Sequence, residues 1–287
     1  MYIWSCSFVL KMSTTTVTQI IIKSKVVTTL PTDVPISVSD VLTGYVEISQ
    51  TATRKNIQDL IKMSSETTAH KLESLAANYK EDVLDKHLSV LDILELYHDI
   101  EMSLATFIQL LPAMRIRQYS ISSSPLWNPE HVTLTLSVVE APAGTGRQGK
   151  FLGVASNYLA NVRPGDRINV GTCGITFPYT MLTFFVGVRS SSAAFHLPQD
   201  ASVPVVMFAA GSGIAPMRGF IQERAIQFAH GRKIGKATLF YGCRSPDEDY
   251  LYANDDFDEW MKLGFLEIKP AFSRATERSG GSKYVQE

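Results

Sequence analysis

The sequence predicts a multi-domain α+β protein with a helical segment, an antiparallel sheet closed into a barrel, and a parallel α/β sheet. Three observations predict this fold class. Residues 54–111 contain no Gly or Pro and repeat apolar residues every three or four positions, which is typical of helices. Residues 117–139 alternate polar and apolar side chains, as half-buried strands do. From residue 204 onward, apolar runs of strand length alternate with helical segments, as in a parallel α/β sheet.

The composition excludes several classes of protein. A chain of 287 residues favours two domains over one, and 45% hydrophobic residues exclude disorder over the whole chain. With 27 Lys+Arg against 28 Asp+Glu, the sequence lacks the basic surface expected of a nucleic-acid-binding protein. Its 3 cysteines provide neither a disulfide framework nor zinc-ligand spacing. No apolar run is long enough to span a membrane, so we expect a soluble, cytoplasmic protein in a reducing compartment.

The N-terminal third divides into two parts. Residues 1–33 form a poorly assigned N-terminal segment. Its first 30 residues are rich in Thr, Ser and β-branched residues, which we interpret as a poorly ordered leader or an edge strand. Residues 34–114 are predicted to form a helical connecting subdomain. Ser37 with Asp40, and Ser89 with Asp92, have the spacing of helix capping boxes. The three histidines of this region lie 17 and 11 positions apart, which does not favour a metal site: His70, His87 and His98.

The middle of the chain, residues 115–200, is predicted to be the antiparallel barrel. Pro112 ends the helices, and strands are expected over 117–125 and 131–139. A turn at Pro164-Gly165-Asp166 then leads into a further strand.

Residues 201–287 are predicted to form the α/β domain in the order βαβαβ, the mononucleotide-binding half of a parallel sheet. The expected elements are a strand at 205–210, a helix at 217–229, a strand at 237–241, a helix at 249–263 and a strand at 265–271.

A glycine-rich turn joins the first of these strands to its helix. Gly211, Ser212 and Gly213 allow the backbone to approach a phosphate, and the N-terminus of the following helix offers free N–H groups. Pro216 suits the first turn of that helix because it has no N–H to leave unpaired. A tight turn with a purely structural role remains the alternative.

Basic residues follow the other two strands of this sheet. Arg244 and Arg274 come after the second and third strands, and Lys283 follows, where a site for NAD would place an acidic residue on the ribose. These cations suit a 2′-phosphate and therefore favour NADP(H). The alternative is a solvated patch of charge.

Two further groups of residues suit a flat, anionic ligand. Arg117 and Tyr119 would project from one face of a strand, where a guanidinium and a phenol ring can meet phosphate and an aromatic ring system. Ser156 would cap a short helix whose N-terminus faces a pyrophosphate. From spacing alone, a structural pair and a structural cap are equally good interpretations.

Taken together, six segments of the chain resemble one family. The segments are RQYSISSSP, GVASNYL, AAGSGIAPMRGF, YGCRSPDEDYLY, AFSR and KYVQ. In this order they are similar to NADPH–cytochrome P-450 reductases and other diflavin reductases with a ferredoxin-reductase-like FAD/NADP module. The sequences of these segments most resemble the reductase half of self-sufficient fusions of a haem monooxygenase with its reductase.

The resemblance implies roles for individual residues. Arg117 would bind the FAD pyrophosphate, Tyr119 would stack on the flavin, and Ser120 would act in catalysis beside the flavin atom that accepts hydride. Other FAD contacts would come from Val138, Val139, Gly153, Val154, Ala155 and Ser156. Contacts to NADPH would come from Gly211, Ser212, Gly213, Pro216, Cys243, Arg244, Ser273, Arg274, Lys283, Tyr284 and Gln286.

The resemblance also implies a function and its limits. NADPH would give hydride to FAD, and electrons would pass through FMN to a haem monooxygenase; FMN and haem would belong to partner domains, in the same chain or another. The family continues with a further strand and a Cys-Gly-Asp segment, so the NADP domain is expected to be incomplete and truncated at its C-terminus. A catalytically incomplete fragment that binds flavin weakly or not at all is the alternative. An ordinary NAD-dependent dehydrogenase fits poorly, because no acid–base pair follows the glycine turn.

An atypical insertion interrupts the barrel region at residues 171–185. It is flanked by a repeated Val-Gly, at Val170-Gly171 and Val186-Gly187. We hypothesise that this segment is an unremoved intron or an error in the gene model, which sequencing of the processed transcript would decide.

Overall fold

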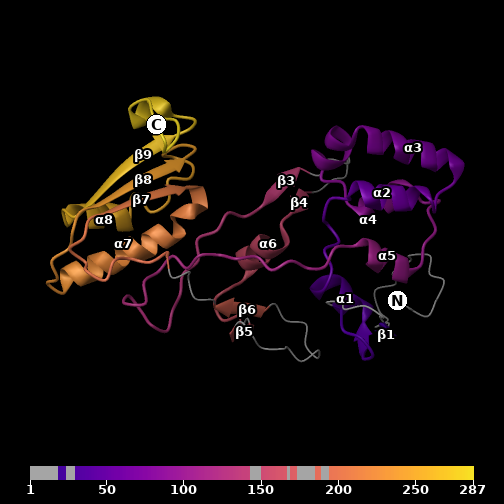
Figure 1. The fold of residues 1–287 in the computed structure, drawn as a ribbon, viewed down its shortest axis with the longest axis horizontal. Coiled ribbons are helices and arrows are strands. Elements are labelled where there is room, and N and C mark those ends of the chain that lie inside the picture. The colour runs from indigo at the N-terminus through magenta and orange to yellow at the C-terminus, as the bar shows by residue number, and fades with distance from the viewer. Residues whose placement is uncertain (1–18, 24–29, 143–149, 167–168, 173–184, 189–193) are drawn as a thin grey trace. The chain divides into compact units, whose positions relative to one another are not determined.

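The computed structural model describes residues 19–23, 30–142, 150–166, 169–172, 185–188 and 194–287. They form two compact units (Figure 1). The first unit combines Met1–Ile116 with Val139–Arg189, and the second combines Arg117–Val138 with Ser190–Glu287. The predictions for residues 1–18 and for most of the insertion, 173–184, lie outside the described residues.

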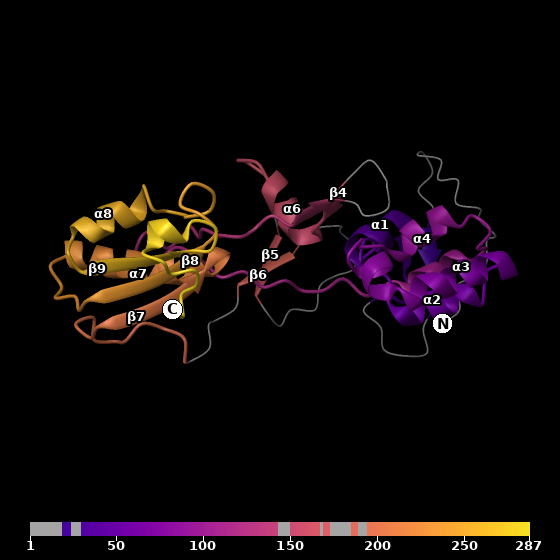
Figure 2. The same ribbon diagram turned by 90° about the horizontal axis from the view of Figure 1, so that it is seen from above.

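The first unit is built mainly of short helices, as the pattern at 54–111 predicts. They are α1 (Val38–Gly44), α2 (Arg54–Ile61), α3 (Glu66–Ala77), a π-helical turn (Lys80–Leu84), α4 (Val90–Leu96) and α5 (Leu104–Leu110). Figure 2 shows α2 and α3 side by side.

Hydroxyl side chains set where these helices begin. The N-cap residues of α2, α3, α4 and α5 are Thr53, Ser65, Ser89 and Ser103, and each accepts an N–H from the first turn. The capping box predicted at Ser89 is confirmed, because the side chain of Asp92 also accepts the Ser89 N–H at 2.9 Å. The cap predicted at Ser37 is confirmed as well, since its Oγ accepts the Asp40 N–H at 2.9 Å. Substituting such a cap typically costs about 1 kcal/mol.

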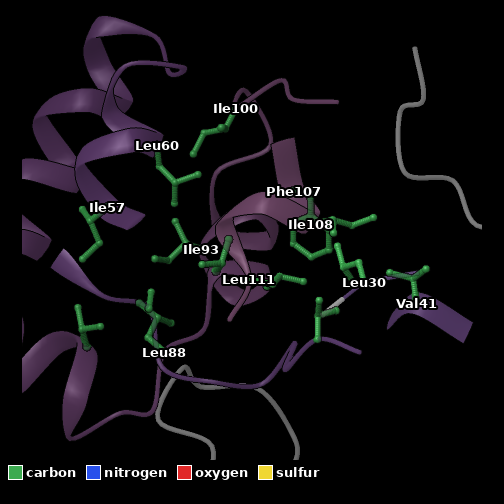
Figure 3. Packing of buried hydrophobic residues seen from close by; sticks show 14 of the residues in the cluster. Leu30, Val41, Ile57, Leu60, Leu88, Ile93, Ile100, Phe107, Ile108 and Leu111 are labelled. Atoms are coloured by element: carbon green, nitrogen blue, oxygen red, sulfur yellow. The ribbon is translucent and has the colours of Figure 1, made fainter. Parts of the chain in front are cut away.

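Apolar residues at helical spacing form the core of the first unit. Ile57 and Leu60 of α2, Ile93 of α4, and Phe107 and Ile108 of α5 are buried against one another (Figure 3). Since each short helix is marginal alone, this shared burial holds the helices in place.

Short strand pairs complete the first unit. The strands β1 (Gln19–Ile21) and β2 (Pro35–Ser37) pair antiparallel, as do β3 (Glu140–Pro142) and β4 (Lys150–Leu152). β5 (Asn169–Thr172) confirms the strand predicted after the Pro164 turn, but it pairs parallel with β6 (Phe185–Val188). In that pair the two copies of the repeated Val-Gly lie directly opposite each other.

The strands predicted over 117–125 and 131–139 are wrong as continuous strands. Only one isolated antiparallel bridge, between Ile121 and Leu134, remains of them, and the described residues contain no closed barrel. The physical reason is the lack of a packing surface, because Val132 and Val138 are 60% and 45% exposed. Two strands without a covered apolar face are marginal in water.

The second unit contains the predicted parallel sheet. Its strands are β7 (Val205–Ala210), β8 (Ala237–Cys243) and β9 (Leu266–Phe272), in the spatial order β7-β8-β9. All strand pairs are parallel. The connecting helices are α7 (Ile214–Ala229) and α8 (Asp256–Lys262), so the βαβαβ order is confirmed. α8 is shorter than the predicted helix at 249–263, because Tyr252 has a φ of +64°, a left-handed conformation that a right-handed helix does not accommodate.

Both helices pack on one face of this sheet. Leu239 and Tyr241 of β8 are buried against Ile221 of α7 and Phe257 of α8. On the opposite face, Val206 and Phe208 are 61% and 56% exposed, and the ring of Phe208 stacks on Phe240 with centroids 5.0 Å apart. Within the described residues, no helix is both long and apolar enough to cross a membrane.

Candidate functional site

The residues predicted to bind a nucleotide gather at one edge of the parallel sheet, which we call the carboxyl edge. It is formed where β7, β8 and β9 end, at Ala210, Cys243 and Phe272. The predicted residues follow directly after each strand, because parallel strands all end at the same edge. In open α/β sheets, ligands bind beyond this edge.

The glycine-rich turn leaves open space beside its backbone. Gly211–Gly213 forms a single 3-10 turn, and α7 begins directly after it at Ile214, so Pro216 occupies the first turn of the helix as predicted. Gly211 has a φ of +50°, and a Cβ placed on Gly211 or Gly213 would meet no atom within 4 Å. The turn therefore has room for a group to approach its backbone, and the helix N-terminus favours a negatively charged one.

Backbone hydrogen bonds hold the two predicted arginines next to each other. Beyond the ends of β8 and β9, the N–H of Ser273 donates to the carbonyl of Cys243 at 3.0 Å, and the N–H of Arg274 donates to the carbonyl of Arg244 at 2.8 Å. Hydrogen bonds between the two segments therefore continue past the ends of both strands. The side chains of Arg244 and Arg274 are 53% and 61% exposed, which leaves both guanidinium groups accessible.

An acidic turn after β8 positions Arg244. One carboxylate oxygen of Asp249 accepts the N–H groups of Arg244 and Ser245, and the other accepts Nε of Arg244 at 2.9 Å. Burial raises the pKa of Asp249, but these hydrogen bonds and the Arg244 charge outweigh it, so the pKa lies below its usual value. Asp249 therefore stays ionised at neutral pH and fixes the Arg244 side chain.

Glu248 lies between the two arginines. Its Oε2 is 3.6 Å from Nε of Arg244 and 3.4 Å from Nη1 of Arg274. Two guanidinium groups that approach one anionic oxygen are a donor set suited to a phosphate. The residues at this edge thus fit the phosphorylated nucleotide that the charge pattern predicts.

The last residues of the chain pass over the end of β8. A Cβ on Gly242 would lie 3.0 Å from a methyl group of Val285, so this position leaves little room for a side chain. The backbone N–H groups of Lys283 and Tyr284 donate to the carboxylate of Glu287, and Nζ of Lys283 lies 5.3 Å from the Tyr284 ring centroid. Lys283, Tyr284 and the exposed Gln286 are thus placed near the carboxyl edge, in the same unit as Arg244.

Cys243, the last residue of β8, is buried. Burial raises the pKa of its thiol to about 12, and the neighbouring Asp249 carboxylate adds to the shift. Its Sγ lies 3.8 Å from the carbonyl of Ser245. Because the thiolate is the reactive form, this environment makes Cys243 an inert packing residue at neutral pH.

We expect Cys243 to react with iodoacetamide at pH 8 at least about tenfold more slowly in the folded chain than in the same chain unfolded in urea. Mass-spectrometric mapping of the alkylated peptides separates Cys243 from the other two cysteines. Equal rates in the two states would contradict the buried, protonated thiol.

The predicted flavin residues Arg117, Tyr119 and Ser120 lie outside any helix or strand, at the start of the second unit. Arg117 and Ser120 are exposed and Tyr119 is half-buried. Just after them, Ser122, Ser123 and Ser124 are buried, although the strand pattern predicts alternation there. This short segment is held both by α7 and by Thr133, whose carbonyl accepts the Ser122 N–H at 2.8 Å and whose N–H donates to the Ser123 hydroxyl at 3.0 Å.

Three residues of α7 hold that segment. The guanidinium of Arg218 donates to the carbonyl of Ser122 at 2.7 Å, and Gln222 accepts the N–H of Ser124 at 2.8 Å. Glu223 accepts the Ser124 hydroxyl at 3.2 Å. The polypeptide that carries Ser120 is thereby tied to the helix that follows the glycine turn.

Arg218 is the centre of these contacts. Its side chain is 11% exposed, it forms an ion pair with Asp256 of α8 with Nε 2.7 Å from Oδ2, and its guanidinium lies 4.6 Å from the ring centroid of Tyr252 and 5.8 Å from that of Trp260. The hydroxyl of Tyr252 in turn hydrogen-bonds Thr135. One arginine therefore joins α7, α8 and the segment after Ser120.

The other predicted flavin residues lie in the first unit, except Val138, which the second unit contains. Gly153, not Ser156, is the N-cap of α6 (Val154–Asn161), so the cap predicted at Ser156 is wrong. The Ser156 hydroxyl is buried, accepts the N–H of Val139 at 3.1 Å and donates to the carbonyl of Gly153 at 3.3 Å, so it caps no N–H of the helix.

Close packing explains the glycine at the start of this helix. A Cβ on Gly153 would lie 2.7 Å from the Cβ of Val139 and 2.9 Å from the Ser156 hydroxyl. The half-buried Val154 and Ala155 follow in the first turn of α6, where their backbone N–H groups are available to an anion.

Sequence reasoning missed Arg218, Glu248 and Asp249. A signal for Arg218 exists, since it is a lone cation in the otherwise apolar start of a helix. The three successive acids after Ser245-Pro246 could also have been recognised as partners for Arg244. Their specific pairings depend on how the ends of β8 and β9 meet.

Comparison with known proteins identifies two domain families in this chain. Residues 8–158 match the family model described as FAD binding domain, and residues 207–287 match that of the oxidoreductase NAD-binding domain. The second match covers the parallel sheet and the carboxyl edge.

Several curated proteins are similar over nearly the whole chain. A self-sufficient cytochrome P-450 monooxygenase from Phanerodontia chrysosporium is 54% identical over 270 residues, which are 94% of this chain and 24% of that protein. A bifunctional cytochrome P-450/NADPH–P-450 reductase from Fusarium oxysporum is 45% identical over 93% of this chain and 24% of its own length. A similar bifunctional protein from Acremonium egyptiacum is 42% identical over 91% of this chain. The chain thus spans about a quarter of the length of these relatives.

Proposed function

The chain belongs to the family of FAD-binding oxidoreductase domains, and on that premise we propose that it is the FAD- and NADPH-binding module of a cytochrome P-450 reductase. In this proposal it moves reducing equivalents from NADPH to FAD and onward to an FMN domain and a haem monooxygenase. The observation that carries the proposal is the pair Arg244 and Arg274 at the same carboxyl edge as a glycine turn with open space.

The preference for NADPH over NADH is supported by the donor set. Arg244 and Arg274 approach one anionic oxygen together, and Lys283 adds a cation from the last segment of the chain. A 2′-phosphate is the group that distinguishes the two coenzymes, and guanidinium groups recognise it well.

The chain's own residues would bind and orient the two cofactors. Gly211, Ser212 and Gly213 offer backbone N–H groups and space to a pyrophosphate, with Pro216 starting the helix behind them. When bound, NADPH supplies a hydride and FAD accepts it. Ser120 offers a hydroxyl for a hydrogen bond beside the accepting atom, and Arg218 fixes the segment on which Ser120 lies.

In this proposal two groups of residues bind flavin: Arg117, Tyr119 and Ser120 of the second unit, and the start of α6 of the first unit. Arg117 supplies a permanent cation for the pyrophosphate and Tyr119 a ring for stacking. Gly153 to Ser156 supply the helix start, and Val138 and Val139 an apolar contact along the flavin. The match of residues 8–158 to the FAD binding domain family supports a flavin-binding role for this part of the chain.

The partners in this proposal follow from the relatives. Their names join a cytochrome P-450 to an NADPH–P-450 reductase in one polypeptide, and the present chain aligns with about a quarter of each. We therefore propose a haem monooxygenase as the final electron acceptor, with an FMN domain between it and this module.

The experiment that tests the proposal is expression of the 287-residue chain followed by two measurements. We expect a bound-flavin absorbance spectrum after purification and NADPH-dependent reduction of ferricyanide. NADH at the same concentration is the matched control and is expected to be at least about tenfold slower, because it lacks the phosphate. Flavin without turnover would indicate a catalytically incomplete module, and a colourless protein would contradict the proposed flavin site.

A further inference from the structure

The strongest unassigned feature of the molecule is the position of Glu248 at the carboxyl edge. Its Oε2 approaches both Arg244 and Arg274, at 3.6 Å and 3.4 Å, so a single carboxylate oxygen lies between two guanidinium groups. A phosphate that uses the same two arginines must meet this carboxylate, because both are anions with the same partners.

Glu248 is not needed to place Arg244. Asp249 holds the Arg244 side chain through Nε at 2.9 Å and also accepts the Arg244 N–H. That contact is shorter than the 3.6 Å between Arg244 and Glu248. Removing the Glu248 charge therefore leaves the Arg244 side chain held.

Arg274 is placed by its backbone. Its N–H donates to the carbonyl of Arg244 at 2.8 Å, which fixes the start of its side chain whatever Glu248 does. The remaining effect of Glu248 is electrostatic, since it supplies a negative charge where the two guanidinium groups converge.

We propose that Glu248 is a specificity-determining residue that occupies the anion position between Arg244 and Arg274 and is displaced by the 2′-phosphate of the coenzyme. The inference rests on the proposed function, since it assumes that a 2′-phosphate binds these two arginines. Glu248 then lowers the affinity for the phosphorylated nucleotide and leaves that for the unphosphorylated one unchanged, so it limits how tightly the coenzyme is held.

The expected effect is moderate because the groups are half-exposed. The side chain of Glu248 is 46% exposed, and those of Arg244 and Arg274 are 53% and 61% exposed, so water and salt screen the charges. We expect Glu248→Gln to tighten the binding of a 2′-phosphorylated nucleotide by about two- to fivefold.

The test measures the binding of two nucleotides to the full chain by isothermal titration calorimetry. Adenosine 2′,5′-bisphosphate carries the 2′-phosphate, and adenosine 5′-monophosphate lacks it. E248Q and E248A are compared with the unchanged chain. Glu267→Gln is the matched control, because Glu267 is an exposed glutamate of the same sheet whose Oε1 lies 3.4 Å from a cation, Lys269.

The inference is supported if E248Q and E248A bind the bisphosphate more tightly, bind the monophosphate as before, and E267Q changes neither. The inference is overturned if both Glu248 variants bind the bisphosphate no more tightly than the unchanged chain does. It is also overturned if the affinities for the bisphosphate and the monophosphate increase by the same factor. If the unchanged chain does not prefer the bisphosphate, the proposed function itself fails, and that result is distinct from a preference that Glu248 does not alter.

Discussion

Replacing Arg274 with alanine is expected to raise the dissociation constant for NADPH by about 10- to 100-fold and that for NADH by no more than about twofold. The reason is that the variant loses a charge-assisted hydrogen bond that only the 2′-phosphate can accept. The backbone contact from the Arg274 N–H to the Arg244 carbonyl is retained, so the site keeps its shape. Titration of both coenzymes against each variant measures the change in preference.

The matched control for this variant is Arg232→Ala. Arg232 is an exposed arginine in the loop that leads from α7 to β8, at the opposite edge of the same sheet. The Arg232→Ala substitution removes the same charge but leaves the carboxyl edge unaltered. We therefore expect the dissociation constant of either coenzyme to change by less than about twofold. An equal loss of NADPH and NADH binding in R274A would refute the phosphate role of Arg274.

Replacing Arg218 with methionine is expected to lower the free energy of unfolding of the second unit by about 2–4 kcal/mol. The variant loses the bond to the Ser122 carbonyl, the contacts with the rings of Tyr252 and Trp260, and the ion pair with Asp256. This expected loss of stability is smaller than the loss for breaking a fully buried ion pair, because the side chain of Asp256 is 30% exposed and stays partly hydrated. Urea unfolding followed by Trp fluorescence measures the change.

Two further variants separate the contributions at Arg218. Asp256→Asn removes only the ion pair and is expected to cost less than R218M, since the bond to Ser122 and the ring contacts remain. Arg232→Met makes the same substitution at an exposed site and is expected to stay within about 0.5 kcal/mol of the unchanged chain. A loss below about 1 kcal/mol in R218M would contradict a central role for Arg218.

The features that could be predicted from sequence are those set by neighbours in the chain. The strand of residues 205–210 is found with the predicted bounds, because a run of apolar residues ends at a glycine turn that no strand can continue through. The helix capping box at Ser89 and Asp92 involves groups only three residues apart, so its geometry follows from their spacing in the sequence.

The features that could not be predicted depend on partners far away in the chain. Ser156 has the sequence of a cap, but its hydroxyl bonds the N–H of Val139, which is 17 residues earlier. Ser122 to Ser124 alternate like a strand, but all three are buried, and Ser124 bonds Gln222 and Glu223 of α7, almost 100 residues later. Local propensity is overridden where tertiary contacts supply the hydrogen bonds.

The same limit applies at the candidate site. The presence of arginines after β8 and β9 follows from the sequence pattern, and so does the prediction that they bind a phosphate. That Glu248 lies between them does not, because it requires the hydrogen bonds between the two segments to continue past the ends of both strands. The balance of charge at the site is thus a property of the folded chain.

The position of Arg218 within α7 has a consequence for motion. The glycine turn ends at Gly213, and Arg218 lies little more than one helical turn further along the same rigid helix, where it holds the Ser122 carbonyl. A shift of that turn is therefore transmitted by α7 to the segment that begins two residues after Ser120. The glycine turn and the segment Ser122–Ser124 are thus mechanically coupled, and we expect them to move as one body rather than as independent loops.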